Sequence, residues 1–334
     1  QLSSDLKDEF DSVHVASTGG LWERELAAQG IQHHKILDID SKNPVTVLKL
    51  LFSIHQIIKQ KGITIVHTHH RMAAFYIRLL KFVYPKLTHV YTAHNVFKDK
   101  LHLYRFALKK AKSVAVGEAV NNNLKEDVGI TDSKVIYNGV ILKETDNQVD
   151  DIVGYDGTKL GCIARLSEQK GLTYLIEAMS LLTVKNIRLF IVGDGELRNE
   201  LENKVEELHL QDSVTFLGYR KDIVECINSF DFLASSSLFE GLALNIIEAF
   251  MNGKTMVATD IPGINEVVND ENGILVPAKN PGALAGAIDK LATDVPLRNR
   301  LAFHAKKTYE KRFSYSMFLE NYRALYREIQ GEPK

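Results

Sequence analysis

Residues 238–268 read LFEGLALNIIEAFMNGKTMVATDIPGINEVV. The apolar segment that begins at Leu242 predicts a buried helix, and Gly253 is well placed to end it. The run from Thr255 to Ala258 then predicts a buried strand. A helix that leads directly into a buried strand is the repeating unit of an α/β domain with a parallel sheet.

The same alternation of strands and helices extends over nearly the whole chain. Six strands are expected in the first half, near residues 12–16, 32–37, 64–67, 88–92, 113–116 and 134–137. Six more are expected in the second half, near residues 159–164, 188–192, 213–217, 231–234, 255–258 and 273–276. Each half therefore predicts one doubly wound α/β domain.

A polar, acidic segment, Leu142–Gly157, separates the two series and predicts an interdomain linker with its boundary near Asp150. We expect a first domain over residues 1–150 and a second over residues 151–314. Residues 315–334 form an amphipathic helix that is expected to pack back on the first domain. Residues 1–7 resemble the end of a helix, so a first strand is expected to be missing from the first domain.

The composition is that of a globular protein with two cores. The chain has 334 residues, of which 45% are hydrophobic and 25% charged, and a net charge of −1 gives no general argument for nucleic-acid binding. Cys162 and Cys226 lie far apart and form no metal-ligand pair. No run approaches 18 apolar residues. These features favour a cytoplasmic protein without disulfides.

Two glutamates, Glu240 and Glu248, are eight residues apart around the start of the helix in the quoted segment. Eight helical residues separate side chains by about 12 Å along the axis and about 80° around it, so one ligand could contact both. The backbone N–H groups of residues 243–245 lie between them, where phosphate oxygens bind favourably. Taken alone, such glutamates are more often solvated surface groups.

Two cations follow a buried strand in GCIARLSEQKG, residues 161–171. Arg165 ends the strand, and Lys170 precedes the next helix. Side chains at the carboxyl end of a parallel strand face the crevice where α/β domains bind ligands. Arg165 and Lys170 could therefore neutralise a diphosphate, although solvation of a loop would also explain them.

These two segments occur in one order with four shorter ones: TAHN (92–95), YNGV (137–140), VGDGELR (192–198) and FLGY (216–219). Together they resemble glycosyltransferase family 4, whose members are retaining transferases of the GT-B type. The resemblance covers essentially the whole chain. It implies two Rossmann-like domains that face each other across a cleft, a nucleotide-diphosphate sugar as donor, and neither metal nor cofactor.

The resemblance also implies individual roles. Glu248 would hold the ribose hydroxyls, Glu240 a hydroxyl of the donor sugar, and Arg165 with Lys170 the diphosphate. His94 would face the reacting sugar. The remaining implied donor-binding residues are Gly193, Leu217, Tyr219, Ala243, Leu244 and Asn245. The catalytic set is thus expected to be Arg165, Lys170, Glu240 and His94.

The first half supplies candidates for the acceptor side, namely His67, His69 and Asn95. His67 and His69 are expected on the same side of a strand. A metal site at these histidines is an alternative, but no carboxylate or Cys partner is evident nearby.

Residues 71–112 contain ten Lys or Arg and one acid, Asp99, interleaved with aromatic residues. They predict either ordinary helices with a solvated face or a surface that docks on anionic lipid. We therefore expect transfer of a hexose or N-acetylhexosamine, with a UDP-sugar favoured, to a hydroxyl acceptor that is lipid-linked, by a cytoplasmic enzyme peripheral to the membrane. The alternatives are a nucleotide-sugar epimerase and a non-catalytic sugar-nucleotide binding module.

Overall fold

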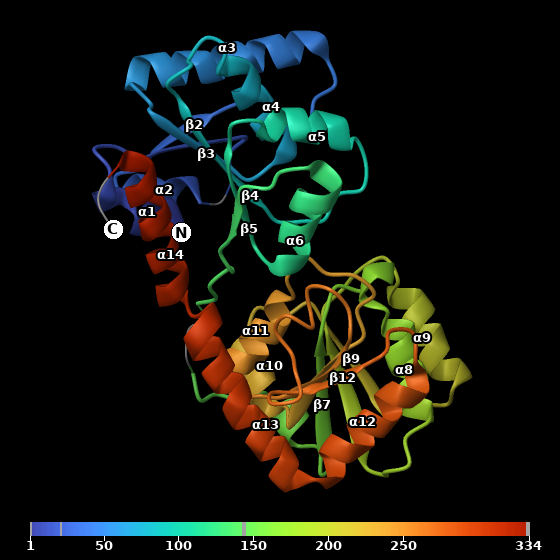
Figure 1. Cartoon of the computed structure of the whole chain (residues 1–334). Helices are drawn as coiled ribbons and strands as arrows, with labels where there is room; N and C mark the ends of the chain where they lie inside the picture. Colours follow the sequence, from blue (N-terminus) through green and yellow to red (C-terminus); the bar gives the residue numbers. More distant parts are fainter. Residues whose placement is uncertain (1, 21, 142–144, 332–334) are drawn as a thin grey trace. The chain divides into compact units, whose positions relative to one another are not determined.

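A computed structural model describes residues 2–20, 22–141 and 145–331. The chain divides into two compact units (Figure 1). Unit 1 contains the chain up to Tyr137 and again from Phe318 on, and unit 2 contains Asn138–Met317. Both units are α/β structures with parallel strands, which confirms the predicted fold class.

The strands of unit 1 lie in two parallel sheets. β3 (Ile65–Thr68), β4 (Thr88–Ala93), β5 (Lys112–Ala115) and β6 (Ser133–Val135) form a four-stranded sheet in that order. β1 (His14–Ser17) pairs only with β2 (Gln32–Lys35) in a separate sheet of two. All six predicted strands are present within about two residues of their expected bounds.

The helices of unit 1 connect and cover these strands, as Figure 1 shows. They are α1 (Leu2–Asp5), η1 (Lys7–Glu9), α2 (Glu23–Ala28), α3 (Pro44–Lys61), α4 (Arg71–Leu80), α5 (Leu101–Leu108), α6 (Glu118–Asn122), η2 (Asn123–Val128) and α14 (Tyr315–Gln330). Asn43 begins α3 by accepting a hydrogen bond from the backbone of Val45 at 2.9 Å, and Gly62 ends it with a φ of 62°.

The last helix belongs to the core of unit 1. Tyr322, Leu325 and Tyr326 of α14 pack with Val90 and Val114 of the four-stranded sheet. The apolar face of α14 therefore covers the four-stranded sheet. Without this helix, Val90 and Val114 would face water.

Unit 2 has a single six-stranded parallel sheet. Its order is β12 (Ile274–Val276), β11 (Met256–Thr259), β10 (Phe232–Ser235), β7 (Thr158–Ile163), β8 (Ile187–Val192) and β9 (Val214–Gly218). Strands β7, β8 and β9 follow one another toward one edge of the sheet, and β10, β11 and β12 follow one another toward the other edge. The switch point therefore lies between β7 and β10. In such sheets ligands bind beyond the carboxyl ends of the strands at this switch point.

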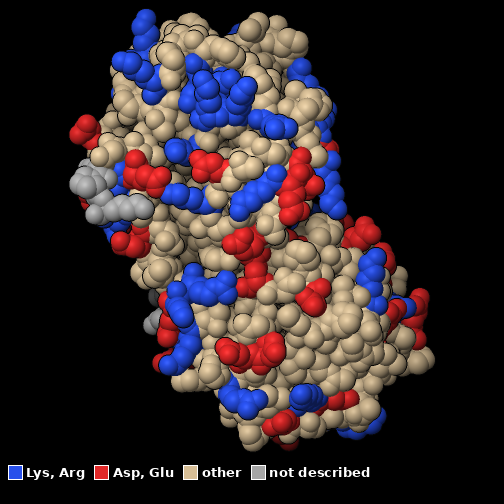
Figure 2. All heavy atoms as spheres, in the orientation of Figure 1, with Lys and Arg blue, Asp and Glu red and all other residues tan. Residues whose placement is uncertain are grey.

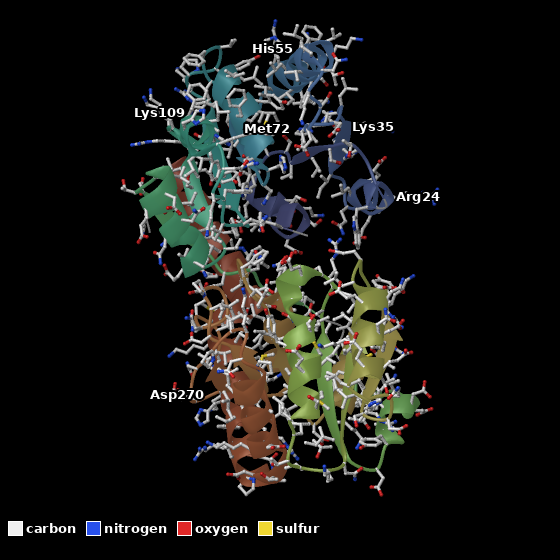
Figure 3. The ribbon with its side chains drawn as sticks, turned by 90° about the vertical axis from the view of Figure 1, so that its right-hand side faces the viewer. Arg24, Lys35, His55, Met72, Lys109 and Asp270 are labelled. Atoms are coloured by element: carbon white, nitrogen blue, oxygen red, sulfur yellow. The ribbon has the colours of Figure 1, made fainter. Side chains whose placement is uncertain are left out.

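The helices of unit 2 cover both faces of that sheet. They are α7 (Asp150–Val153), η3 (Glu168–Lys170), α8 (Leu172–Ser180), α9 (Arg198–Glu207), α10 (Ile223–Ser229), α11 (Leu244–Met251), α12 (Pro281–Thr293), α13 (Val295–Thr308) and η4 (Tyr309–Phe313). Figure 3 shows their side chains and those of unit 1, with Asp270 marking unit 2.

Residues 142–144 of the segment expected as a linker lie outside the described residues, and the part around Gln148 and Val149 is folded onto unit 2. Val149 donates a backbone hydrogen bond to Ser229 at 2.8 Å, and Gln148 donates to the carbonyl of Asn228 at 3.0 Å. Ile152 of α7 is completely buried. The unit boundary therefore lies after Tyr137 rather than near Asp150, because one helical turn with a single buried Ile is hidden within a polar, acidic segment.

Candidate active site

A cavity of about 780 Å³ opens at the switch point of unit 2. It lies beyond the carboxyl ends of β7 and β8, and the loop after β10 closes another side. Seven of the residues expected to bind or react with the donor line it: Arg165, Lys170, Gly193, Tyr219, Glu240, Leu244 and Asn245. Leu217, Ala243 and Glu248 are not among its lining residues.

Lys170 and Glu240 form an ion pair in the wall of this cavity, with 2.5 Å between Nζ and Oε1. Glu240 is largely buried, with 8% of its side chain exposed, and Lys170 is 19% exposed. Ser237 donates a second hydrogen bond to Oε1 of Glu240 at 2.9 Å, and Gln169 donates to Oε2 at 3.4 Å. The carboxylate is thus held in one orientation by three donors.

Arg165 has a much more open position. Its guanidinium is 73% exposed and lies 3.1 Å from the carboxylate of Glu196. An exposed ion pair of this kind is weak, so the Arg165 fork can exchange Glu196 for another anion at little cost. Lys170 and Arg165 therefore place one fixed and one adjustable cation at the same cavity.

The amino end of α11 also reaches the cavity, through Leu244 and Asn245. The Asn245 side chain donates to the carbonyl of Ile163 at 2.8 Å and so ties α11 to the end of β7. Among the residues described, the backbone N–H groups of Leu244 and Asn245 donate no hydrogen bond within the chain. These two donors are available to a ligand, whereas Ala243 is buried and caps the helix.

The two glutamates lie on either side of the start of α11. α11 starts at Leu244, so Glu240 precedes the helix and Glu248 lies inside it, as expected. The separation calculated for eight helical residues does not apply, because residues 240–243 are not helical. Glu248 follows Leu244 by one helical turn and lies on the same face of α11. Burial raises the pKa of Glu248 to about 7. Its carboxyl is therefore partly protonated near neutral pH.

Gly193 lets two loops approach closely at the base of the cavity. It has a φ of 139°, and a Cβ atom there would lie 1.9 Å from the carbonyl oxygen of Ala164. Its N–H donates to the carbonyl of Gly218 at 2.8 Å. No side chain fits at this position, which explains why the sequence has glycine there.

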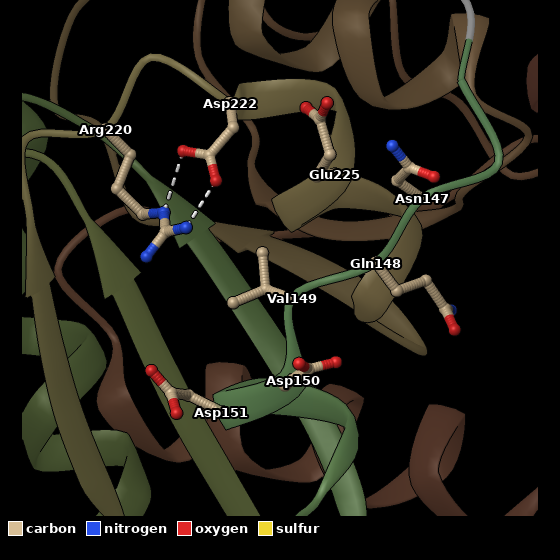
Figure 4. Close-up of a pocket in the computed structure, with 8 residues that line it drawn as sticks. All are labelled: Asn147, Gln148, Val149, Asp150, Asp151, Arg220, Asp222 and Glu225. Atoms are coloured by element: carbon tan, nitrogen blue, oxygen red, sulfur yellow. Dashed lines mark hydrogen bonds and ion pairs between the residues drawn. The ribbon is translucent and has the colours of Figure 1, made fainter.

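A second cavity, of about 520 Å³, lies beside the first in unit 2 (Figure 4). Arg220 lines both cavities and forms an ion pair with Asp222, with 2.9 Å between Nε and Oδ1. Asp150, Asp151 and Glu225 add further acids around the second cavity. Its excess of carboxylates disfavours phosphate, so the first cavity is the better site for an anionic ligand.

Three histidines of unit 1, His67, His69 and His94, lie close together at the carboxyl ends of β3 and β4. The His67 and His69 rings stack with 4.3 Å between their centroids, which confirms that they point to the same side. His69 is hydrogen-bonded to His94, with 3.1 Å between Nδ1 and Nε2. His94 directly follows β4, and its neighbour Asn95 is exposed.

His67 uses both of its ring nitrogens in a hydrogen-bonded network. Nδ1 lies 2.7 Å from the Tyr326 hydroxyl, and Nε2 lies 2.8 Å from Oγ1 of Thr92. Thr92 is in turn 2.8 Å from the Tyr322 hydroxyl. These partners leave no nitrogen of His67 for a metal ion. Within the described residues, no group of three His, Cys, Asp or Glu could hold a metal ion.

We expect acid to destabilise unit 1 through its buried histidines. His89 is 1% exposed, its Nε2 lies 2.8 Å from Oγ1 of Thr68, and burial lowers its pKa to about 3. Below pH 6.5 the unfolded chain gains a proton that folded His89 does not bind. The free energy of unfolding should therefore fall by about 2 kcal/mol between pH 7 and pH 5 from His89 alone.

Urea unfolding at pH 7, 6 and 5 would measure this loss. The matched control is the double variant Thr68→Val with His89→Leu, which removes both hydrogen-bond partners together. Its pH dependence should be clearly smaller than that of the wild type. An identical dependence in both proteins would rule out His89 as the cause.

The protein consists of two α/β units. One of them has a charged cavity at its topological switch point, the usual position of a ligand site in this class of two-domain α/β protein. The sequence matches two family models: Glycosyltransferase Family 4 over residues 1–144, and Glycosyl transferases group 1 over residues 153–308. A glycosyltransferase from Rickettsia africae ESF-5 superposes with a TM-score of 0.84 over 98% of this chain and 93% of its own, at 26% identity. The chain belongs to the family 4 glycosyltransferases of GT-B fold.

Two further similarities concern the fold and the sequence, respectively. HepE of Anabaena, solved in complex with UDP, has a TM-score of 0.84 over 98% of this chain and 95% of its own, at 22% identity. An uncharacterized glycosyltransferase of Methanocaldococcus jannaschii is 30% identical over 216 residues. That alignment covers 59% of this chain and 55% of the relative, so the chain spans about half the length of this curated relative.

Several residues of the candidate site were not found from the sequence. Gln169 and Ser237 orient Glu240, and Glu196 pairs with Arg165. Ser237 lies in the polar Ser235–Ser237 segment after β10, which was a usable signal. For Tyr322 and Tyr326 the sequence indicated only that their helix packs on the first domain. Their contact with His67 could not be predicted, because they follow it by more than 250 residues.

Proposed function

We propose that the protein is a retaining glycosyltransferase that moves a hexose or N-acetylhexosamine from a UDP-sugar to a hydroxyl acceptor. The supporting observation is the convergence of Arg165, the Lys170–Glu240 pair and the free N–H groups of α11 on one cavity of about 780 Å³. Cations and helix N-terminal donors suit a diphosphate, and the buried carboxylate suits a sugar hydroxyl. The UDP bound to HepE supports the choice of base.

Each residue has a distinct part in the proposed reaction. As the sugar leaves, negative charge grows on the diphosphate, and Lys170, Arg165 and the α11 N–H groups stabilise it. The ion pair with Glu240 already holds the Lys170 ammonium group in place. This group therefore does not have to move when the bond between the sugar and the diphosphate breaks. Glu240 holds the sugar, and Glu248 holds the ribose from the next turn of α11. These groups would offset the leaving-group charge without a divalent ion.

Retention of configuration is proposed without a carboxylate nucleophile. Glu240 is engaged with Lys170, Ser237 and Gln169, so its oxygens are poorly placed to attack an anomeric carbon. The acceptor would attack from the face that the phosphate leaves, and the leaving phosphate oxygen would take the acceptor proton. His94 is kept neutral because burial lowers its pKa, and it is proposed as a catalytic residue.

The acceptor is proposed to be a lipid-linked glycan intermediate of cell-surface polysaccharide synthesis, reached by a cytoplasmic enzyme peripheral to the membrane. The cation-rich residues 71–112 support this choice, because basic segments are attracted to anionic lipid headgroups. Within the described part of the chain, no helix is long and apolar enough to span a bilayer.

A thermal-stabilisation screen with UDP-, GDP- and ADP-sugars tests the donor. A ligand at 100 times its dissociation constant adds about 2.7 kcal/mol to the free energy of unfolding. We expect this gain with a UDP-sugar, undiminished by a metal chelator, and sugar transfer only when an acceptor is present. Interconversion of the donor without an acceptor would instead identify an epimerase, and stabilisation without either reaction would identify a binding module.

A further inference from the structure

The exposed face of α3 carries large apolar side chains. Val45, Leu48 and Phe52 are 59%, 67% and 63% exposed. At 100° per residue their directions fall within about 60° of one another, so they form one stripe along the first two turns of the helix. The opposite face of α3 is already packed, since Leu50 and Ile58 are buried. The helix thus has an apolar face beyond the one that its own core uses.

The stripe continues onto the turn after α4. The Phe52 ring lies 6.4 Å from the His55 ring, and His55 lies 5.5 Å from the Tyr84 ring. Tyr84 and His55 are also hydrogen-bonded, with 2.9 Å between the hydroxyl and Nδ1. Phe82 and Val83, in the same turn as Tyr84, are 69% and 62% exposed. We call Val45, Leu48, Phe52, Phe82 and Val83 the α3–α4 ridge.

The surroundings of the ridge are positive. Between Ser41 and Lys98 the sequence has no acidic residue, and its cations are Lys42, Lys49, Lys59, Lys61, Arg71, Arg78, Lys81, Lys86 and Lys98. The Arg78 guanidinium lies 4.9 Å from the Phe82 ring centre, and Lys81 donates to the carbonyl of Lys110 at 3.4 Å. Figure 2 shows Lys and Arg gathered over the region that Figure 1 labels α3, α4 and α5.

Contiguous exposed apolar groups bordered by cations favour one kind of partner. Large exposed apolar patches mark interaction sites. A nucleic-acid backbone would satisfy the cations but offers nothing to Leu48 or Phe52, whereas an anionic bilayer offers both headgroup charge and an apolar interior. We propose that the α3–α4 ridge inserts into an anionic lipid surface, with the flanking lysines on the headgroups. This inference rests on the proposed function and deepens it, because it names the surface through which the enzyme would reach a lipid-linked acceptor.

Sedimentation with lipid vesicles tests the ridge directly, in the absence of donor and acceptor. The full chain should bind vesicles of phosphatidylcholine with phosphatidylglycerol and not vesicles of phosphatidylcholine alone. The double variant Leu48→Ser with Phe52→Ser should bind about tenfold more weakly or worse, because complete burial of a single Leu or Phe side chain is worth that factor. The triple variant Lys42→Gln, Lys49→Gln and Lys86→Gln should also bind more weakly, most clearly at low salt.

The matched control is Leu181→Ser with Phe303→Ser in unit 2. Both residues are exposed, at 54% and 58%. This double variant therefore removes the same two types of side chain, one Leu and one Phe, at positions away from the ridge. It should bind vesicles like the wild type. All variants should keep the thermal stabilisation by the donor, which separates failure of the ridge from failure of the proposed transferase site.

A fluorescent reporter detects insertion itself. Trp22 is the only tryptophan, so Phe52→Trp in a Trp22→Phe background reports from the ridge alone. Its emission should shift to the blue with anionic vesicles and not with duplex DNA. Absence of binding, binding that the ridge variant leaves unchanged, or an unshifted emission with bound vesicles would each overturn the proposal. Preference for DNA over vesicles would assign the cations to nucleic acid instead.

Discussion

Replacement of Lys170 by Ala should lower turnover by roughly 100-fold or more, the usual effect of losing one preorganised electrostatic donor. Lys170 is held 2.5 Å from Glu240 and lines the cavity, so no neighbouring side chain can take over its position without moving. Arg165→Ala should lower turnover by a similar factor, since the developing charge on the diphosphate would lose its second cation. Steady-state kinetics with a UDP-sugar and acceptor would measure both.

The two variants should differ in stability, which separates chemistry from folding. Lys170→Ala leaves the largely buried Glu240 without its cation and should cost about 1–3 kcal/mol. Arg165→Ala breaks an exposed pair and should cost almost nothing. The double variant Lys170→Ala with Glu240→Gln should regain stability but not activity. Lys185→Ala, an exposed lysine of unit 2 outside the cavity, is the neutral control. Wild-type turnover in either Lys170→Ala or Arg165→Ala would refute the diphosphate site.

The two glutamates should separate nucleotide binding from sugar recognition. Glu248→Gln should weaken binding of UDP by about tenfold, because a carboxylate accepts hydrogen bonds from ribose hydroxyls more strongly than an amide does. Glu240→Gln should leave UDP binding nearly intact and impair use of the UDP-sugar by a larger factor. Calorimetry at pH 8, where Glu248 is ionised, would compare the two variants. Equal, wild-type affinity in both would remove the ribose role from Glu248.

Glu248 also predicts a pH dependence of donor binding. Burial raises its pKa to about 7, so the free protein below pH 7 carries mostly a protonated carboxyl, which accepts hydrogen bonds from hydroxyls more weakly than a carboxylate does. If the donor binds the ionised form, affinity should fall by up to about tenfold per pH unit below 7 and level off above it. A UDP-sugar suits this measurement, because its diphosphate does not titrate in that range. Glu248→Gln should abolish the dependence.

The sequence alone determined the order and type of the elements. Each predicted strand is present. Most strands of unit 2 are buried, continuous apolar runs of the kind that composition and periodicity reveal, whereas β2 (QHHK) is polar and only partly buried. The sequence also predicted seven of the residues that line the candidate cavity. Residues that follow parallel strands meet at one edge of the sheet, which is the physical basis for grouping the cations there. Arg165 and Lys170 after β7 could be assigned to this edge from their position alone, whereas Gly193 after β8 and Glu240 after β10 were joined with them through the resemblance to family 4 glycosyltransferases.

Only the tertiary structure decided how these residues engage one another. The sequence could not show that Lys170 is paired with Glu240 or that Arg165 is exposed and paired with Glu196, because each depends on side-chain directions set by packing. It also could not show that Tyr322 and Tyr326 of α14 complete the His67 network, or that Leu48 and Phe52 face outward. Local patterns fix which face of a helix is apolar, but whether that face is covered depends on residues far away in the chain.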